Sequence, residues 1–599
     1  MSKNKIKKRS EVDPKYTWDV DSMYSSENDW EDDFKKVSEK INEIKRYKGQ
    51  ILKDSTTLLE VLKLKDEISR TLHNLFAYAN MKKDEDTSNS KYQGLTDRAS
   101  SLIVKVEGAL SFIVPELLSK DEDLIRRYIK EESQLKVYDH YLNEIIRQKK
   151  HILSEKEEAI IAQVGEVANG PENIFSMLNN ADLEFPTIKD ENGDEITITH
   201  GRFIPLLENK DRRVREEAFK GLYNTYTKFR NTFASTLSTD VKKNIFYSKV
   251  RKYNSSLEAS LDDNNIPVKV YDNLIKAVHN NLEYMHRYVK LRKKALGVDK
   301  LHMYDLYTPI VEDIDMNIDY QQAKEKVIEG LKPLGNKYND IVKEGFNSRW
   351  IDVYENKGKR SGAYSGGTYD SKPFILLNYQ NTLDNVFTIA HEMGHSMHSY
   401  LSKTNQPYIY SGYSIFVAEV ASTVNEALLM DYLLNNAKTK KEKLYILNHY
   451  LEQFRATVYR QTMFAEFEKI IHEEVEQGKS LTADNLSNIY KDLNKKYYGD
   501  EIVIDDEIAM EWARIPHFYY NFYVYQYATG FSAAIDLSQK ILEDGNEAVD
   551  KYLNFLKSGS SDYPIEVLKK AGVDMTQEYP VDNALKLFGK LVDKMESLI

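Results

Sequence analysis

The sequence predicts a mostly helical protein, and three observations support this fold class. Glycine (25) and proline (13) are scarce for a chain of 599 residues, so residues that break helices are few. Long stretches rich in Lys, Glu, Leu and Ala repeat their apolar residues with the period of amphipathic helices. The chain also exceeds the usual ceiling for one compact core, so we expect at least two packed regions.

The composition excludes several classes of function. A net charge of −11 argues against a general nucleic-acid binder, because neutralising phosphates requires a basic face. The absence of cysteine excludes disulfides and thiolate metal ligands, and it fits a cytoplasmic protein. The basic residues 1–9 precede no apolar segment of a secretory signal, and the most apolar stretch, Leu102 to Leu118, is interrupted by charges. We therefore expect a cytoplasmic protein that does not span a membrane.

The N-terminal region is predicted to be helical to about residue 180 and to end in a β-hairpin. Residues 185–188 and 196–199 have the character of strands, and Asn192-Gly193 between them is a typical hairpin turn. This hairpin suggests a division into an N-terminal helical region, 1–200, and a region that carries the functional motifs, 201–599. Helix is predicted again from Phe203 to about Gly297, and the C-terminal part is also helical.

The most informative motif is His391-Glu392-Met393-Gly394-His395. Two imidazoles four residues apart on a helix can bind one metal ion, and the Glu between them can reach a metal-bound water. A helix is predicted from 382 to 401, with Thr382 as its N-cap and the histidines opposite its apolar face. That apolar face consists of Val386, Ile389, Ala390, Met393, Met397 and Leu401. The alternative, a buried helix with core histidines, is disfavoured by the intervening Glu.

A catalytic zinc site usually takes three protein ligands and leaves a fourth position for water. An elongated motif would require His at position 401, where the chain has Leu401, so a metzincin-type site is disfavoured. The first carboxylate after His395 is Glu419, on a second predicted helix. Glu426 lies two turns further along the same face and could be the ligand instead, or could fix the tautomer of a ligand imidazole; we favour Glu419. His398 is expected to line the site or to contact one of the ligands, since a fourth protein ligand would exclude water.

These residues resemble a known family. The segment HEMGHSMHSY at 391–400, followed by FVAEVASTVNEA at 416–427, is similar to the oligoendopeptidase F branch of the thimet-oligopeptidase-like zinc metallopeptidases. The resemblance is close from about Ser361 to Phe531. It implies one Zn²⁺ per chain held by His391, His395 and Glu419, with Glu392 as the catalytic carboxylate. It also implies a helical ellipsoid of two packed halves, with the site deep in a channel that admits unstructured oligopeptides and excludes folded proteins.

A second constellation lies between residues 514 and 527. His517 comes just before Tyr519, Tyr520, Tyr523, Tyr525 and Tyr527. Phenol hydroxyls and an imidazole N–H can donate hydrogen bonds to the oxyanion that forms during peptide hydrolysis. The family uses a His and downstream Tyr residues in this way, but the spacing differs here. Tyr523, Tyr525 and Tyr527 are therefore all candidates and Tyr520 stays open, while at least half of the cluster is expected to be structural.

A small β-sheet is predicted beside the metal-binding helix. Residues 361–369 are rich in turn formers, and residues 374–379 have the pattern of a short strand. The edge of such a sheet could bind an extended peptide through main-chain hydrogen bonds, or the sheet could only support the helix.

Together these features predict a zinc-dependent endopeptidase that hydrolyses internal bonds of short unstructured oligopeptides. Metal-activated water would be the nucleophile and Glu392 the general base. A helical zinc carboxypeptidase could use the same ligands, whereas a catalytically inactive peptide-binding protein is disfavoured by the intact ligands and base. Oligopeptides are the expected partners, nucleic acids and membranes are not, and the oligomeric state stays open.

Overall fold

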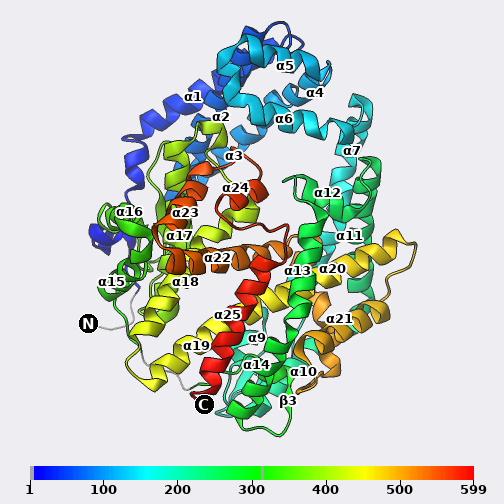
Figure 1. Ribbon diagram of the computed structural model, residues 1–599. Helices are drawn as coiled ribbons and strands as arrows, with labels where there is room; N and C mark the ends of the chain where they lie inside the picture. Colours follow the sequence, from blue (N-terminus) through cyan, green and yellow to red (C-terminus); the bar gives the residue numbers. More distant parts are fainter. Residues whose placement is uncertain (1–5, 312–315) are drawn as a thin grey trace. The chain divides into compact units, whose positions relative to one another are not determined.

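The computed structural model describes residues 6–311 and 316–599, and its secondary structure is predominantly helical (Figure 1). The mostly helical fold expected from the scarcity of helix breakers is therefore confirmed. Residues 1–5 of the basic N-terminus lie outside the described residues. The chain folds into two compact units, each built from three segments. Unit 1 comprises Met1–Lys150, Met316–Tyr432 and Leu537–Gly572, and unit 2 comprises His151–Asp315, Leu433–Asp536 and Val573–Ile599.

Unit 1 is helical with one small sheet. Its helices are α1 (Glu27–Ile44), α2 (Ser55–Glu85), α3 (Ser90–Leu110), α4 (Ile113–Leu118), α5 (Glu122–Glu131), α6 (Asp139–Gln148), α15 (Tyr320–Gly330), α16 (Gly335–Asn347), α17 (Leu383–Asn405), α23 (Asn546–Ser558) and α24 (Pro564–Lys570). Helix α18 (Ile415–Asn436) begins in unit 1 and ends in unit 2, whereas α22 (Tyr525–Asp544) begins in unit 2 and ends in unit 1.

The sheet of unit 1 contains β4 (Ile351–Asp352), β5 (Tyr364–Gly366) and β6 (Phe374–Leu376) in the order β4-β6-β5. Strand β5 is antiparallel to β6, and β4 is parallel to it. The predicted sheet beside the metal-binding helix is therefore present. Its two-residue strand β4 was not predicted, because two residues are too few to show a period.

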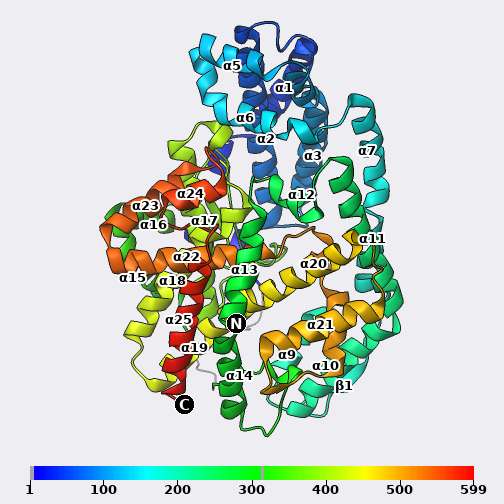
Figure 2. The ribbon, with the colours of Figure 1, turned by 45° about the vertical axis from the view of Figure 1, so that its right-hand side comes forward.

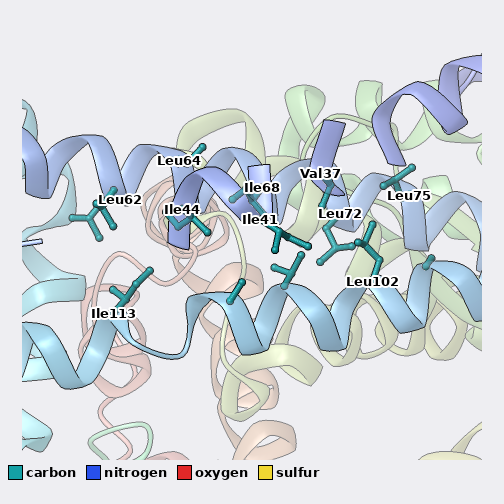
Figure 3. Close-up of a cluster of buried hydrophobic side chains, with 14 of the residues drawn as sticks. Val37, Ile41, Ile44, Leu62, Leu64, Ile68, Leu72, Leu75, Leu102 and Ile113 are labelled. Atoms are coloured by element: carbon teal, nitrogen blue, oxygen red, sulfur yellow. The ribbon is translucent and has the colours of Figure 1, made fainter. Parts of the chain in front are cut away.

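Part of the core of unit 1 lies between its first helices. Helix α1 is N-capped by Ser26 and α2 by Asp54, whose side chains accept backbone N–H groups of the first turn. Figure 3 shows apolar side chains of α1, α2 and α3 meeting, among them Val37, Ile41, Ile68, Leu72 and Leu102. Burial of each such side chain contributes roughly 1.5–3 kcal/mol to folding.

Unit 2 is also helical. Its helices are α7 (Glu155–Ala168), α8 (Gly170–Met177), α9 (His200–Leu207), α10 (Arg212–Lys228), α11 (Arg230–Val250), α12 (Ser256–Asp262), α13 (Val268–Asn280), α14 (Leu282–Leu296), α19 (Lys440–Phe454), α20 (Arg460–Glu476), α21 (Ala483–Tyr498) and α25 (Tyr579–Glu596). Helix α20 packs against α11, α13 and α21 (Figure 2). Strand β3 (Leu301–His302) pairs in parallel with β7 (Ile502–Val503).

The predicted hairpin is present in unit 2. Strands β1 (Thr187–Lys189) and β2 (Glu195–Thr197) are antiparallel, with Ile188 opposite Ile196. Gly193 in the turn has φ +88°, a left-handed value that glycine adopts without a steric penalty. The division of the chain at residue 200 rests on this hairpin and stays a prediction.

Among the residues described, none of the helices is both long enough and apolar enough to cross a membrane.

Candidate metal centre

Helix α17 carries the histidine motif and begins where the sequence predicted a helix. The Thr382 hydroxyl accepts the backbone N–H of Asn385 at 3.2 Å, which satisfies one of the free donors of the first turn. Val386, Ile389 and Met393 are fully buried on one face of α17. His391 and His395 are only partly buried, so both rings are accessible from the other face.

Gly394 allows α17 and α18 to cross at very short range. A Cβ at Gly394 would lie 2.5 Å from the Ser422 Cα and 2.6 Å from the Ala421 carbonyl oxygen, so only glycine fits. The crossing is also held by Asn425, whose side-chain amide donates to the Ala390 carbonyl at 3.1 Å. Close approach of the two helices brings Glu419 of α18 to the imidazoles of α17.

Three side-chain atoms converge at this crossing. The Glu419 Oε2 atom lies 3.2 Å from His391 Nε2 and 3.5 Å from His395 Nε2, and the two Nε2 atoms are 3.2 Å apart. Ligands about 2.1 Å from a tetrahedral metal ion are about 3.4 Å from one another, so the three atoms fit three corners of such a site. Two imidazole nitrogens with facing lone pairs repel each other unless a cation or a proton lies between them. The residues present therefore fit a metal ion with two nitrogen ligands and one oxygen ligand.

Two further side chains contact two of the three candidate ligands. The Nδ1 atom of His391 lies 2.8 Å from Glu426 Oε1, and donation of its proton there leaves the Nε2 lone pair free for a metal. The Ser422 hydroxyl donates to the Glu419 carbonyl at 2.9 Å and also lies 3.2 Å from Glu419 Oε2. Burial alone would lower the pKa of His391, but Glu419 and Glu426 raise it to about 10. Burial would raise the pKa of Glu419, but His391 and His395 hold it well below its usual range. The site thus favours a cation beside an ionised carboxylate.

Glu392 lies next to this cluster and is 8% exposed. Burial raises the pKa of Glu392, although His391 and His395 oppose the shift. The backbone N–H of Ser365 in β5 also donates a hydrogen bond to the Glu392 carboxylate. The carboxyl therefore has a raised proton affinity, which suits a group that accepts and returns a proton.

His398 is not part of the cluster of candidate ligands. It is 1% exposed, and its ring lies flat on the ring of Tyr413, with centroids 3.7 Å apart and an angle of 2° between the planes. Burial lowers the pKa of His398 to about 3, so its imidazole is neutral. His398 supports Tyr413, which sequence reasoning did not identify.

A cleft of about 680 Å³ in unit 1 lies along α17, beyond the histidine motif. Ser399 and Lys403 line it, and Ser399 follows His395 at four-residue spacing, on nearly the same side of α17. Residues from β5 and from the loops around it form other walls, among them Ser365, Gly366, Gly367, Thr368, Tyr369 and Tyr413. The edge strand β5 and the C-terminal half of α17 therefore border the same cleft.

His517 lies in unit 2, in the short 3₁₀ helix Pro516–Tyr519. Three tyrosine rings surround its imidazole: Tyr520, Tyr523 and Tyr527 have ring centroids 5.7, 6.2 and 6.0 Å from it. Burial, together with the charge of Arg460, lowers the pKa of His517. The imidazole is therefore neutral at pH 7 and keeps an N–H that can donate.

The other two tyrosines of the segment are structural. Tyr525 is 3% exposed and packs against Tyr271, with ring centroids 5.1 Å apart. Tyr519 is buried and shares a hydrogen bond of 2.9 Å with Thr236. Because this segment belongs to unit 2 and the candidate ligands belong to unit 1, the joint action of the two groups stays a prediction.

Sequence reasoning missed several residues of the centre. Ser365, Ser422 and Asn425 are small polar residues whose contacts come from neighbouring elements. One signal was available, because glycine is uncommon inside helices and Gly394 in the motif indicates a close helix crossing.

Comparison with known proteins adds independent information. The chain matches the family profile described as Peptidase family M3 over residues 205–587 and that described as Oligopeptidase F over residues 116–185. It is 53% identical over 596 residues to Oligopeptidase PepF of Bacillus subtilis (strain 168), which covers 100% of this chain and 89% of that relative. It is 45% identical over 591 residues to Group B oligopeptidase PepB of Streptococcus agalactiae serotype III (strain NEM316), covering 99% and 98%. The crystal structure of oligoendopeptidase-F from Enterococcus faecium has a TM-score of 0.75 at 44% identity, covering 95% of this chain and 99% of that chain.

Proposed function

This chain belongs to peptidase family M3 and is a metalloendopeptidase that acts on oligopeptides, and we propose that its metal is Zn²⁺ held by His391, His395 and Glu419. The proposal rests on one observation, the mutual spacing of 3.2 to 3.5 Å between their three ligand atoms. Two imidazoles and one carboxylate are a known ligand set of catalytic zinc. Cobalt or manganese could occupy the same donors.

The reaction we propose is hydrolysis of internal peptide bonds in short unstructured peptides. Bound Zn²⁺ would polarise the scissile carbonyl and increase the acidity of a water in the fourth position. Glu392 accepts the proton of the attacking water and returns it to the leaving amine, and its raised pKa supports both transfers. Glu426 holds the His391 ring, and Ser422 holds the Glu419 carboxylate.

We assign donation to the developing oxyanion to His517, Tyr523 and Tyr527. The resemblance to the family and the grouping of these three rings support the assignment. A neutral imidazole donates through its N–H, and a phenol donates through its hydroxyl. Tyr525 is less suited to this role, because its ring packs in the core.

We also propose that the substrate backbone pairs with the outer edge of β5. Strand β5 lies at the end of the sheet order, and Ser365 within it contacts Glu392. A peptide in extended conformation along this edge would pass the catalytic carboxylate and enter the cleft beside Ser399 and Tyr413.

The test is cleavage of an internally quenched peptide that is acetylated at its N-terminus and amidated at its C-terminus. Mass spectrometry of the products identifies the bond that is cut, with the protein as prepared, after a chelator, and after Zn²⁺ is returned. We expect internal cleavage that the chelator abolishes and Zn²⁺ restores. Cleavage only of peptides with a free C-terminus would instead establish a carboxypeptidase. No cleavage with Zn²⁺ bound would support an inactive peptide-binding protein.

A further inference from the structure

The loop that follows His517 contains two consecutive strained residues. Asn521 has φ +46° and Phe522 has φ +58°, and neither is glycine. A residue with a Cβ adopts this left-handed conformation only when its surroundings enforce it, and two in succession are rarer still. Some contact must therefore hold residues 520–523 in this shape.

Both strained residues are held through their backbone groups. The N–H of Phe522 donates to Glu468 Oε1 of α20 at 2.5 Å. The carbonyl of Asn521 accepts the hydroxyl of Ser260 in α12 at 2.8 Å. The Phe522 side chain is 1% exposed, and its ring centroid is 4.4 Å from that of His472. The loop is thus anchored to other residues of unit 2 by two hydrogen bonds and one buried ring.

Glu468 is an unusual residue for its surroundings. It is fully buried, and within the described part of the chain no Lys or Arg pairs with it. Its Oε2 atom has no hydrogen-bond partner. Burial raises the pKa of Glu468 to about 8, so its carboxyl is mostly protonated at pH 7. A buried carboxyl without a charged partner destabilises the fold. The hydrogen bond from the Phe522 N–H is therefore the contact that explains why a carboxyl lies here.

Some side chains of the loop are buried anchors and others are exposed or partly exposed. Tyr519 and Phe522 are buried, whereas Tyr520 is 47% exposed and Tyr523 is partly exposed. Tyr520 and Tyr523 join the ring cluster of His517 and Tyr527. The anchors on one side thus determine where the phenols on the other side are held.

We infer that Glu468 is a positioning residue for catalysis, which presets the Tyr520–Tyr523 loop so that its phenols are placed before substrate arrives. This inference rests on the proposed role of the ring cluster as oxyanion donor. Donors to an oxyanion act in the transition state, so loss of their placement lowers kcat more than it changes KM. Residues of the loop then need no reorganisation when substrate binds.

The test compares Glu468→Leu with Glu468→Gln in the metal-loaded full-length enzyme. Gln keeps an oxygen that accepts the Phe522 N–H, so it should retain kcat to within about threefold of wild type. Leu removes the acceptor, and we expect kcat to fall about tenfold or more with KM changed less than about threefold. Glu466→Gln is the matched control on the same helix, because Glu466 pairs with His279, Lys496 and Tyr497 instead of the loop.

Hydrogen exchange measured by mass spectrometry on residues 518–527 gives a readout independent of turnover. Glu468→Leu should speed exchange there and leave the rest of α20 unchanged. If Glu468→Leu does not fold, Ser260→Ala removes the second anchor and should raise exchange in the same segment with a smaller fall in kcat.

Three outcomes would overturn the inference. Unchanged exchange and kcat in Glu468→Leu would show that the loop needs no anchor. Faster exchange in the loop of Glu468→Leu with unchanged kcat would show that Glu468 does not position the catalytic phenols. If Tyr523→Phe then still lost much of its kcat, the proposed function would stand without the inference. Full activity in Tyr523→Phe, Tyr527→Phe and His517→Ala together would instead refute the oxyanion role of the rings, and the inference with it.

Discussion

The metal cluster of unit 1 and the ring cluster of unit 2 hold their side chains in opposite ways. His391, His395 and Glu419 project from two regular helices that meet at Gly394, so helix period and one close crossing set their geometry. Tyr520 and Tyr523 project from an irregular loop whose strained backbone is held by buried partners. The metal cluster, built on helices, therefore follows from residue spacing, whereas the ring cluster, built on a strained loop, depends on residues distant in sequence.

The largest effect is expected at Glu392, beside the metal cluster. Glu392→Gln keeps the size of the side chain and removes its basicity, so kcat should fall by about 10³-fold or more. Bound metal, measured by elemental analysis, should stay at the wild-type ratio. A variant that keeps more than about a tenth of wild-type turnover would exclude Glu392 as the general base.

Replacing either of the two carboxylates of α18 should lower metal affinity, but to different extents. Glu419→Ala removes a proposed ligand, so the purified protein should contain little metal. Glu426→Ala removes only the partner of His391 and should weaken metal binding by about 10- to 100-fold. Competition with a fluorescent chelator measures both affinities. The reverse order would exchange the roles of Glu419 and Glu426.

Tyrosines of the ring cluster and the buried Tyr525 should differ in how much their replacement lowers kcat. Tyr523→Phe and Tyr527→Phe each remove a hydroxyl beside His517, and kcat should fall by about 10²-fold where that hydroxyl donates to the oxyanion. Tyr525→Phe is the matched control, because its ring is buried against Tyr271, and it should keep kcat to within about threefold. Steady-state kinetics on one capped peptide measures all three. A larger loss in Tyr525→Phe would contradict the distinction.

The helix crossing can be tested with two glycines of unit 1. Gly394→Ala places a methyl group against the Ser422 backbone, so the free energy of unfolding should fall by about 1–3 kcal/mol and metal affinity should drop. Gly108→Ala in α3 is the control, because its Cβ meets open space and the change should stabilise by roughly 0.5–1 kcal/mol. Thermal and urea unfolding measure both. Equal effects would show that the crossing at Gly394 is not tight.

The smallest effect concerns pH and the anchor of the loop. Glu468 keeps its proton up to about pH 8 in the folded protein, whereas its ordinary pKa is 4.5. Its contribution to stability is therefore present at pH 4 and is lost as pH rises toward 8. Glu468→Gln lacks this titration, so its free energy of unfolding relative to wild type should rise by about 1 kcal/mol per pH unit.

Urea unfolding of both proteins at pH 6.5, 7.25 and 8 measures this difference. The pKa of nearby His472 is lowered to about 4 by burial, so it stays neutral in the folded protein over this range. Titration of Asp240, which also faces Glu468, is common to both proteins. A difference that does not change with pH would mean that Glu468 ionises normally in the folded state.

The sequence was most informative where local periodicity decides the structure. The motif at 391–395 and its helix followed from spacing, and the hairpin at 187–197 followed from Asn192-Gly193. It was least informative where distant segments meet. Nothing local distinguishes Tyr523 from Tyr525, because the turn at Asn521 and Phe522 depends on Glu468, more than fifty residues earlier. The partners Ser422 and Asn425 likewise act through a helix crossing that no pattern in α17 reveals.

The three-segment construction of each unit has a consequence for synthesis of the protein in the cell. Unit 1 needs residues as late as Gly572 before its last segment exists, and unit 2 needs the chain from Val573 to Ile599. Because residues emerge from the ribosome in order, neither unit can be completed before the chain has been made at least as far as Gly572. The histidines of α17 are made long before α23, which packs against their helix. A chain cut short before residue 572 therefore contains no complete unit, and active enzyme cannot form from it.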